Sequence, residues 1–211
     1  MTEKTEQKQK DGRRQRGDNT RALAVTNALQ MASIDGLEGL SIAKLAAVLG
    51  TAKSTVHAAF GSKETLQVAV IDETTRLLFK LVVSPSLKAD AGMARLVAVG
   101  DAWMSYLESD IFEGGCVLSS ASLEMDGRTG AARDAIAKAM SDWMNTLSRF
   151  VVDAISNGEI AAKHEPEQLA FELNAIGMAA NWHHQLLGGE ETFRMARLSW
   201  TKILENHKSQ G

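Results

Sequence analysis

The sequence of 211 residues has very little cysteine and proline. Its single cysteine, Cys116, excludes an internal disulfide and favours a reducing compartment. Two prolines and few clusters of β-branched residues favour helices over strands. These scarcities predict a mostly helical protein of the cytoplasm.

Long apolar runs are absent as well. No run approaches the roughly 18 residues that a membrane-spanning helix needs, so we expect no membrane partner. The N-terminal residues are polar and charged rather than apolar, so no secretory signal is expected. With 45% apolar and 23% charged residues, the composition is that of a globular chain with a sizeable core.

Charge and apolar periodicity divide the chain. Lys and Arg outnumber Asp and Glu over residues 1–80, whereas the acids prevail over residues 81–211. Residues 1–18 lack apolar periodicity and are expected to form a disordered basic arm. Helices are expected at residues 20–34, 42–49, 53–60, 63–83, 92–109, 115–125, 130–157, 166–187 and 191–206. The fold class is therefore all-α, with about nine helices and with Pro85 in a linker.

The stretch LSIAKLAAVLGTAKSTVHAAFGSKETL, residues 40–66, predicts two short helices that cross at an angle. Small residues suit the crossing, and Gly50 supplies the left-handed geometry of a tight turn. Val56 and Phe60 would pack inward. The residues left outward are Lys53, Ser54, Thr55, His57 and Ala58. This pattern fits a helix that reads the DNA major groove, and it fits equally an ordinary helical hairpin with a solvated face.

The same stretch resembles the DNA-binding motif of TetR-type transcriptional regulators. RALAVTNALQMASIDGLEG resembles the first helix of that family, and Phe60-Gly61-Ser62-Lys63-Glu64…Leu66 is the strongest element. GGCVLSSASLEMDGRTG is similar to one C-terminal subgroup. The resemblance implies an all-α homodimer with an N-terminal helix-turn-helix domain and a larger ligand-binding and dimerisation domain. We expect the arm at residues 1–18, the DNA-binding domain at 19–65 and the second domain at 66–211.

The resemblance implies roles for residues of the motif. Ser54, Thr55 and Ala58 would approach base edges or thymine methyl groups. Phosphate contacts would come from Lys53, His57, Lys63 and the helix start at Ser41. His57 stands where the family usually has tyrosine, which shortens the reach of that contact.

The basic arm leaves two readings open. It could enter the minor groove next to the motif, or it could remain a solvated tail.

The helix expected at residues 166–187 carries apolar residues on two opposite sides, so it must be sandwiched. One side would face its own core, and the other would face either a second copy of the chain or another element of a monomeric bundle. The resemblance favours the second copy. The predicted dimer interface consists of Trp182, Leu186, Leu187, Trp200 and Leu204.

A small apolar effector is expected between the helices of the second domain. The candidate lining residues are Trp103, Met140, Trp143, Phe171, Asn174 and Met178. Stripes of Met and Trp also occur in plain cores, but flexible methionines suit an adaptable cavity.

Other functions have less support in the sequence. A metal site at His183 and His184 is disfavoured because adjacent helical residues point about 100° apart. No nucleophile–base pair or phosphate-binding glycine loop is visible, so we expect no catalytic residues, no metal and no cofactor. A small helical enzyme and a helical interaction module that binds no DNA remain the alternatives. Both repression and activation fit the sequence, and we expect repression.

Overall fold

The computed structural model describes residues 3–109 and 111–209, with side chains from residue 20 onward. Its elements are α1 (Glu3–Gly39), α2 (Ile42–Val48), α3 (Lys53–Phe60), α4 (Lys63–Leu78), the π-helical segment η1 (Phe79–Val83), α5 (Ser84–Ser86), α6 (Met93–Glu108), α7 (Val117–Glu124), α8 (Ala131–Ser156), α9 (Pro166–Leu187) and α10 (Thr192–His207). With α4, η1 and α5 counted as one rod, the described residues form nine helices and no strand, which confirms the all-α prediction. None of the described helices is long and apolar enough to cross a membrane.

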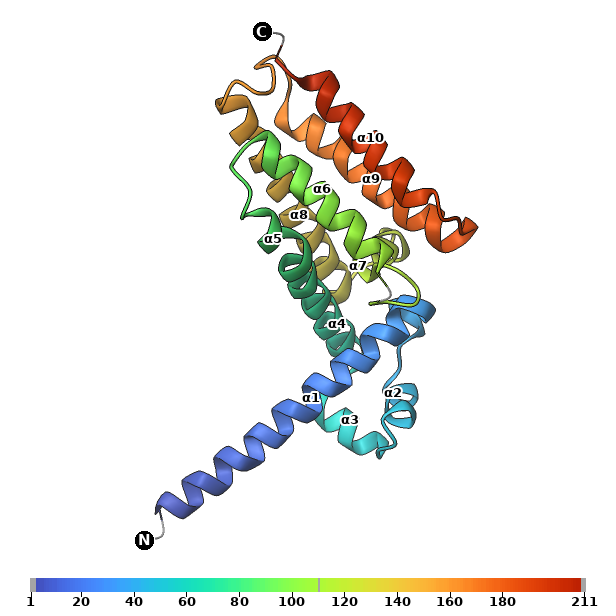
Figure 1. The fold of residues 1–211 in the computed structure, drawn as a ribbon. Coiled ribbons are helices and arrows are strands. Elements are labelled where there is room, and N and C mark those ends of the chain that lie inside the picture. Colours follow the sequence, from blue (N-terminus) through green and yellow to red (C-terminus); the bar gives the residue numbers. More distant parts are fainter. Residues whose placement is uncertain (1–2, 110, 210–211) are drawn as a thin grey trace.

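Helices α1, α2 and α3 lie at one end of the molecule (Figure 1). Their shared core contains the buried Leu37, Leu40, Leu45 and Phe60. Gly36 has a φ of 75°, which turns the chain so that the last residues of α1 leave the main helix axis.

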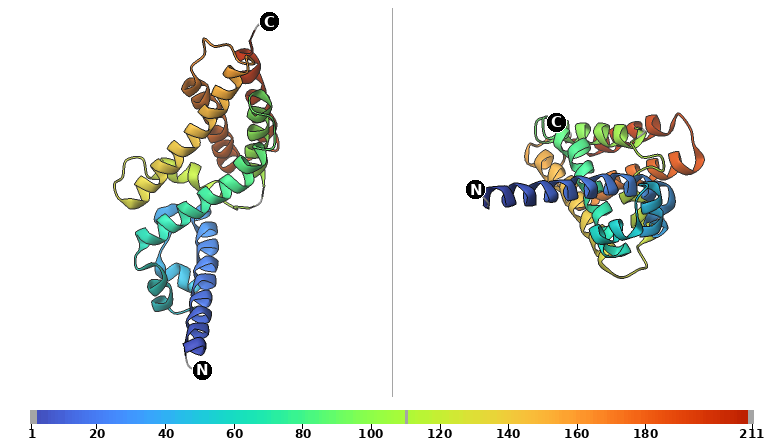
Figure 2. Two further views of the ribbon diagram at one scale, coloured as in Figure 1. Left: turned by 90° about the vertical axis from the view of Figure 1, so that its left-hand side faces the viewer. Right: turned by 90° about the horizontal axis from the view of Figure 1, so that it is seen from below.

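The N-terminal arm differs from its prediction. Residues 3–18 were expected to be disordered but are helical and continuous with the rest of α1, which extends away from the body (Figure 2). Glu, Lys, Gln and Arg dominate this stretch and have high helix propensity. Extending an existing helix needs no new nucleus, so the lack of an apolar stripe does not prevent it. The first two residues of the arm lie outside the described residues.

The rod α4–η1–α5 joins the two ends of the fold. It continues through Ser86, whereas the sequence predicted a helix end near Val83 and a linker at Pro85. Pro85 lies in the first turn of α5, where a missing N–H costs little. The rod is about 36 Å long at 1.5 Å per residue.

Helices α6, α8, α9 and α10 form the larger end of the molecule, with α9 and α10 side by side (Figure 1). Two glycines allow close helix packing there. A Cβ atom on Gly177 would lie 2.2 Å from the ring of Trp103, and one on Gly100 would lie 2.5 Å from the ring of Trp200. In the core of this end, Trp103 and Trp200 therefore pack directly against the backbone of these two glycines.

Candidate nucleic-acid interface

The turn between α2 and α3 is formed by local capping. The Ser41 hydroxyl accepts the N–H of Lys44 at 3.0 Å, which caps the N-terminus of α2. Ile42, Leu45 and Ala46 bury one face of α2. The short connection to α3 then follows, with Gly50 at a φ of 60°.

Helix α3 has one buried side and one exposed side. Val56 and Phe60 are buried, and the guanidinium of Arg21 on α1 lies 5.1 Å from the Phe60 ring centroid. These contacts fix the rotation of α3 about its axis. The residues that remain exposed are Lys53, Ser54, Thr55, His57 and Ala58. The five residues of α3 for which base or phosphate contacts are predicted are therefore all exposed to solvent.

The start of α4 lies next to this face. Gly61 ends α3 with a φ of 72°, and the Ser62 hydroxyl caps α4 by accepting the N–H of Thr65 at 3.0 Å. The ammonium group of Lys63 donates to the Glu38 carbonyl at 2.7 Å and to the Glu38 carboxylate at 3.1 Å. Lys63, which the resemblance assigns to phosphate binding, is thus bonded to Glu38 of its own chain.

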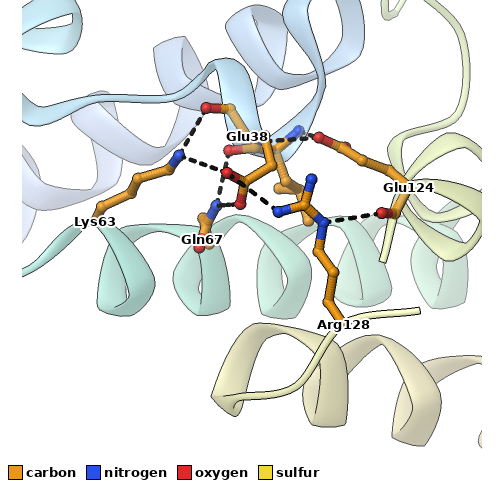
Figure 3. Close-up of polar contacts among 6 residues, drawn as sticks. Glu38, Lys63, Gln67, Glu124 and Arg128 are labelled. Carbon is orange, nitrogen blue, oxygen red and sulfur yellow. Dashed lines mark hydrogen bonds and ion pairs between the residues drawn. The ribbon is translucent and has the colours of Figure 1, made fainter. Parts of the chain in front are cut away.

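Lys63 belongs to a polar network, called here the junction network, formed by Glu38, Lys63, Gln67, Glu124 and Arg128 (Figure 3). Gln67 donates to the Leu37 carbonyl at 2.8 Å and to the Glu38 carboxylate at 3.3 Å. Arg128, in the loop between α7 and α8, lies 3.4 Å from the Glu38 carboxylate. Glu38 therefore connects a helix next to the candidate interface with a loop of the second domain.

Glu124 completes the junction from the second domain. Its carboxylate accepts the backbone N–H groups of Leu37 at 2.9 Å and Glu38 at 2.8 Å, just after the break at Gly36. The hydrogen bond from Lys63 lowers the pKa of the Glu38 carboxyl, and bonds and charges from Gln67 and Arg128 act in the same direction, against partial burial. Glu38 lies 25 residues from Lys63 and 86 residues from Glu124 in the sequence, so no local sequence pattern indicated this network.

The predicted effector residues come together only in part. Trp103, Met140, Trp143 and Met178 line an internal cavity of about 10 Å³, close to the smallest volume that holds one water. Asn174 lies behind Trp143 and accepts its indole N–H at 3.1 Å.

Phe171 lies elsewhere. It is 63% exposed and lines a surface groove of about 530 Å³ between α9 and α10. Phe171 was predicted to line the cavity because it lies on the same side of α9 as Met178. At the position of Phe171, that side of the helix faces solvent.

The predicted dimer residues also divide into two groups. Trp182, Leu186 and Leu187 are 51%, 66% and 62% exposed at the C-terminal end of α9. Trp200 and Leu204 are instead buried within their own chain, and the Trp200 indole donates to the Leu96 carbonyl at 2.9 Å. Helix α10 presents Trp200 and Leu204 toward α6 of the same chain. Their side chains are therefore not available to a partner chain.

Histidine and cysteine side chains have structural contacts. His183 Nδ1 lies 2.8 Å from the Thr192 hydroxyl, and the Tyr106 hydroxyl donates to Cys116 Sγ at 3.7 Å. Burial, and secondarily Cys116, raises the pKa of Tyr106. Within residues 3–109 and 111–209, no group of three His, Cys, Asp or Glu residues is arranged to hold a metal ion.

A short helical pair with an exposed polar face, carried on a larger helical domain, is the arrangement found in helix-turn-helix proteins. Residues 92–200, just over half of the chain, match the tetracyclin repressor-like C-terminal domain. The chain belongs to the TetR family of transcriptional regulators.

Several solved structures have the same fold as this chain. A TetR transcriptional regulator from Chloroflexus aurantiacus superposes with a TM-score of 0.85 at 21% identity, over 93% of this chain and 100% of that one. A TetR-family regulator from Cytophaga hutchinsonii gives 0.82 at 18% identity, over 93% and 98%. A regulator from Saccharomonospora viridis in complex with choline gives 0.75 at 17% identity, over 92% and 100%. No curated protein matches the chain.

Proposed function

We propose that this protein is a cytoplasmic, ligand-responsive repressor that binds a palindromic operator as a homodimer. The observation that carries the proposal is the exposed face of α3, which holds Lys53, Ser54, Thr55 and His57 while Val56 and Phe60 anchor the helix. Short polar side chains on a fixed helix can contact base edges, and the flanking cation can contact phosphates. Ala58 adds an apolar contact for a thymine methyl group.

The homodimer is proposed to form through α9 and the outer side of α10. The exposed Trp182, Leu186 and Leu187 lie on α9, and the groove between α9 and α10 includes Phe171 and Met195. Exposed apolar surfaces of this kind mark interaction sites. A two-fold interface there would place two copies of α3 on successive turns of DNA, so the operator is expected to be a near-palindrome.

The effector is proposed to enter the cavity lined by Trp103, Met140, Trp143 and Met178. The cavity also touches Leu78, the last residue of α4, whose other end begins beside α3. A molecule that wedges the cavity open would tilt α4 and change the distance between the two copies of α3. The choline complex of the S. viridis regulator supports the view that a helical domain of this shape accepts a small molecule.

The decisive experiment is operator binding. Fluorescence anisotropy of a labelled duplex from the DNA upstream of the coding region should show binding that weakens steeply with salt, whereas a scrambled duplex of equal length should bind more weakly. Equal binding to both duplexes, or none to either, would exclude a sequence-specific regulator and leave the enzyme and the interaction module. A reporter gene behind the bound operator should be silenced; stimulation of the reporter would show an activator.

A further inference from the structure

One residue that lines the cavity of the second domain carries an unusual polar atom. Three tryptophans of this domain, Trp103, Trp143 and Trp200, are buried. The indole N–H of Trp143 is bonded to Asn174, and that of Trp200 is bonded to the Leu96 carbonyl. The Trp103 side chain is the exception, because its Nε1 has no acceptor among the described residues although Trp103 is only 3% exposed.

The position of the Trp103 ring is fixed by packing. Its edge lies against the bare backbone of Gly177, and its centroid lies 4.7 Å from the Trp143 ring in a T-shaped arrangement. The Trp200 ring lies 6.3 Å away on a further side. The ring cannot rotate to reach another acceptor without displacing these neighbours, so this donor has no acceptor within the described part of the chain.

A buried donor without an acceptor is costly, and natural proteins rarely tolerate one without a role. The walls of the cavity contain no charged side chain: they are Leu78, Trp103, Cys116, Leu118, Ser119, Met140, Trp143 and Met178. Met140 and Met178 are only partly buried, and their unbranched side chains can move to enlarge a cavity. The site is thus apolar, expandable and provided with one donor.

We propose that the effector is an uncharged, largely apolar molecule with a hydrogen-bond acceptor, such as an aryl ketone, whose oxygen accepts the Trp103 indole N–H. This inference rests on the proposed function, because it names the chemical class of the effector in the cavity assigned there. The same donor disfavours a cation, since the positive end of the N–H dipole would face it. Displacement of Met140 and Met178 by the ligand would press on Leu78 and so on α4.

The test uses the full-length protein and three probes of similar size. Acetophenone carries a carbonyl oxygen, ethylbenzene lacks an acceptor, and phenyltrimethylammonium is a cation. Calorimetric titration should show acetophenone binding about fivefold more tightly than ethylbenzene, the effect of one neutral hydrogen bond, and the cation binding most weakly.

Two variants locate the preference. Trp103→Phe keeps an aromatic ring but removes the donor, and should bind acetophenone and ethylbenzene equally. Trp200→Phe is the matched control, because its N–H is already bonded to Leu96, and it should keep the preference. If Trp103→Phe does not fold, the assigned indole N–H signal of Trp103 in the wild-type NMR spectrum decides: it should shift downfield with acetophenone and not with ethylbenzene.

The outcomes separate this inference from the proposed function. Equal affinity for acetophenone and ethylbenzene in the wild type, or a preference that survives Trp103→Phe, would overturn the acceptor assignment. Tightest binding of phenyltrimethylammonium would overturn it in favour of an aromatic cage for cations. Failure of all three probes to bind, with operator binding intact, would remove the inference and leave the DNA-binding function standing.

Discussion

Replacing Glu38 by glutamine should strengthen operator binding. Lys63 cannot reach a phosphate while its ammonium group lies 3.1 Å from the Glu38 carboxylate, so DNA and Glu38 compete for the same cation. The Glu38→Gln side chain keeps its size and can still accept from Gln67. It removes the charge that attracts Lys63 and leaves only the bond to the Glu38 carbonyl at 2.7 Å, so Lys63 can turn toward the DNA at a lower cost.

The size of the effect follows from solvent exposure. The Glu38 and Lys63 side chains are 41% and 39% exposed, so water screens their attraction. An ion pair of this kind contributes about 0.2–1 kcal/mol. A homodimer releases two copies, so the operator complex should gain about 0.4–2 kcal/mol, or roughly a 2- to 30-fold lower Kd.

The assay is fluorescence anisotropy with the operator duplex, and Asp35→Asn is the matched control. Asp35 lies in the same domain and pairs with Lys44 at 3.3 Å, so its replacement changes net charge equally without touching Lys63. The gain from Glu38→Gln should exceed that from Asp35→Asn and should vanish in a Lys63→Gln background. An equal gain from both variants, or a gain that persists without Lys63, would refute the competition and leave only net charge.

The same residue gives a pH dependence. Because the bond to Lys63 lowers the Glu38 pKa below its ordinary value of 4.5, the stability that Glu38 contributes is present above that pH. It is lost as the pH falls through the lowered pKa of the folded protein. Denaturant unfolding between pH 7 and pH 3 should therefore show a shallower acid loss for Glu38→Gln than for the wild type. Parallel curves for the two proteins would contradict the assigned cause.

The remaining predictions concern the DNA face, the dimer and the core. Lys53→Ala should weaken binding to all duplexes alike and reduce the salt slope by about two, one for each copy in the proposed homodimer, whereas Thr55→Ala should change base preference; the reverse pattern would contradict the placement of α3 on the DNA. Leu186→Glu should sediment as a monomer and lose the operator, while Val152→Glu, an exposed site on α8, should remain dimeric. Gly177→Ala should lower the free energy of unfolding by about 1–3 kcal/mol, because its Cβ would overlap the Trp103 ring; thermal melts that match the wild type would show that the ring can move.

Local chemistry made part of this structure predictable. The helix at residues 166–187 was placed correctly because Pro166 starts it and Gly188 ends it. The face of α3 followed from the spacing of Val56 and Phe60. In both cases the deciding residues lie within a turn or two of each other.

Where the sequence interpretation erred, distant contacts decided the result. Trp200 and Leu204 were predicted to face a partner chain, but they are buried in the core, where α10 packs against α6. Phe171 shares a helical stripe with Met178, yet only the latter reaches the cavity. The pairing of Glu38 with Arg128 joins two residues 90 positions apart in the sequence, so no local periodicity could predict it.

The π-helical segment η1 lies closer to the C-terminal end of the α4–η1–α5 rod than to its N-terminal end. A small tilt at η1 therefore moves the distant start of α4 by a larger distance. The longer arm of the rod, from Lys63 to Leu78, measures about 24 Å at 1.5 Å per residue. With η1 as pivot, a tilt of about 5° would move the Lys63 end by about 2 Å, and two such arms in a dimer would change the span by about 4 Å. That exceeds the 3.4 Å step between base pairs. A tilt of only a few degrees at η1 would thus put the second half-site out of register by about one base pair.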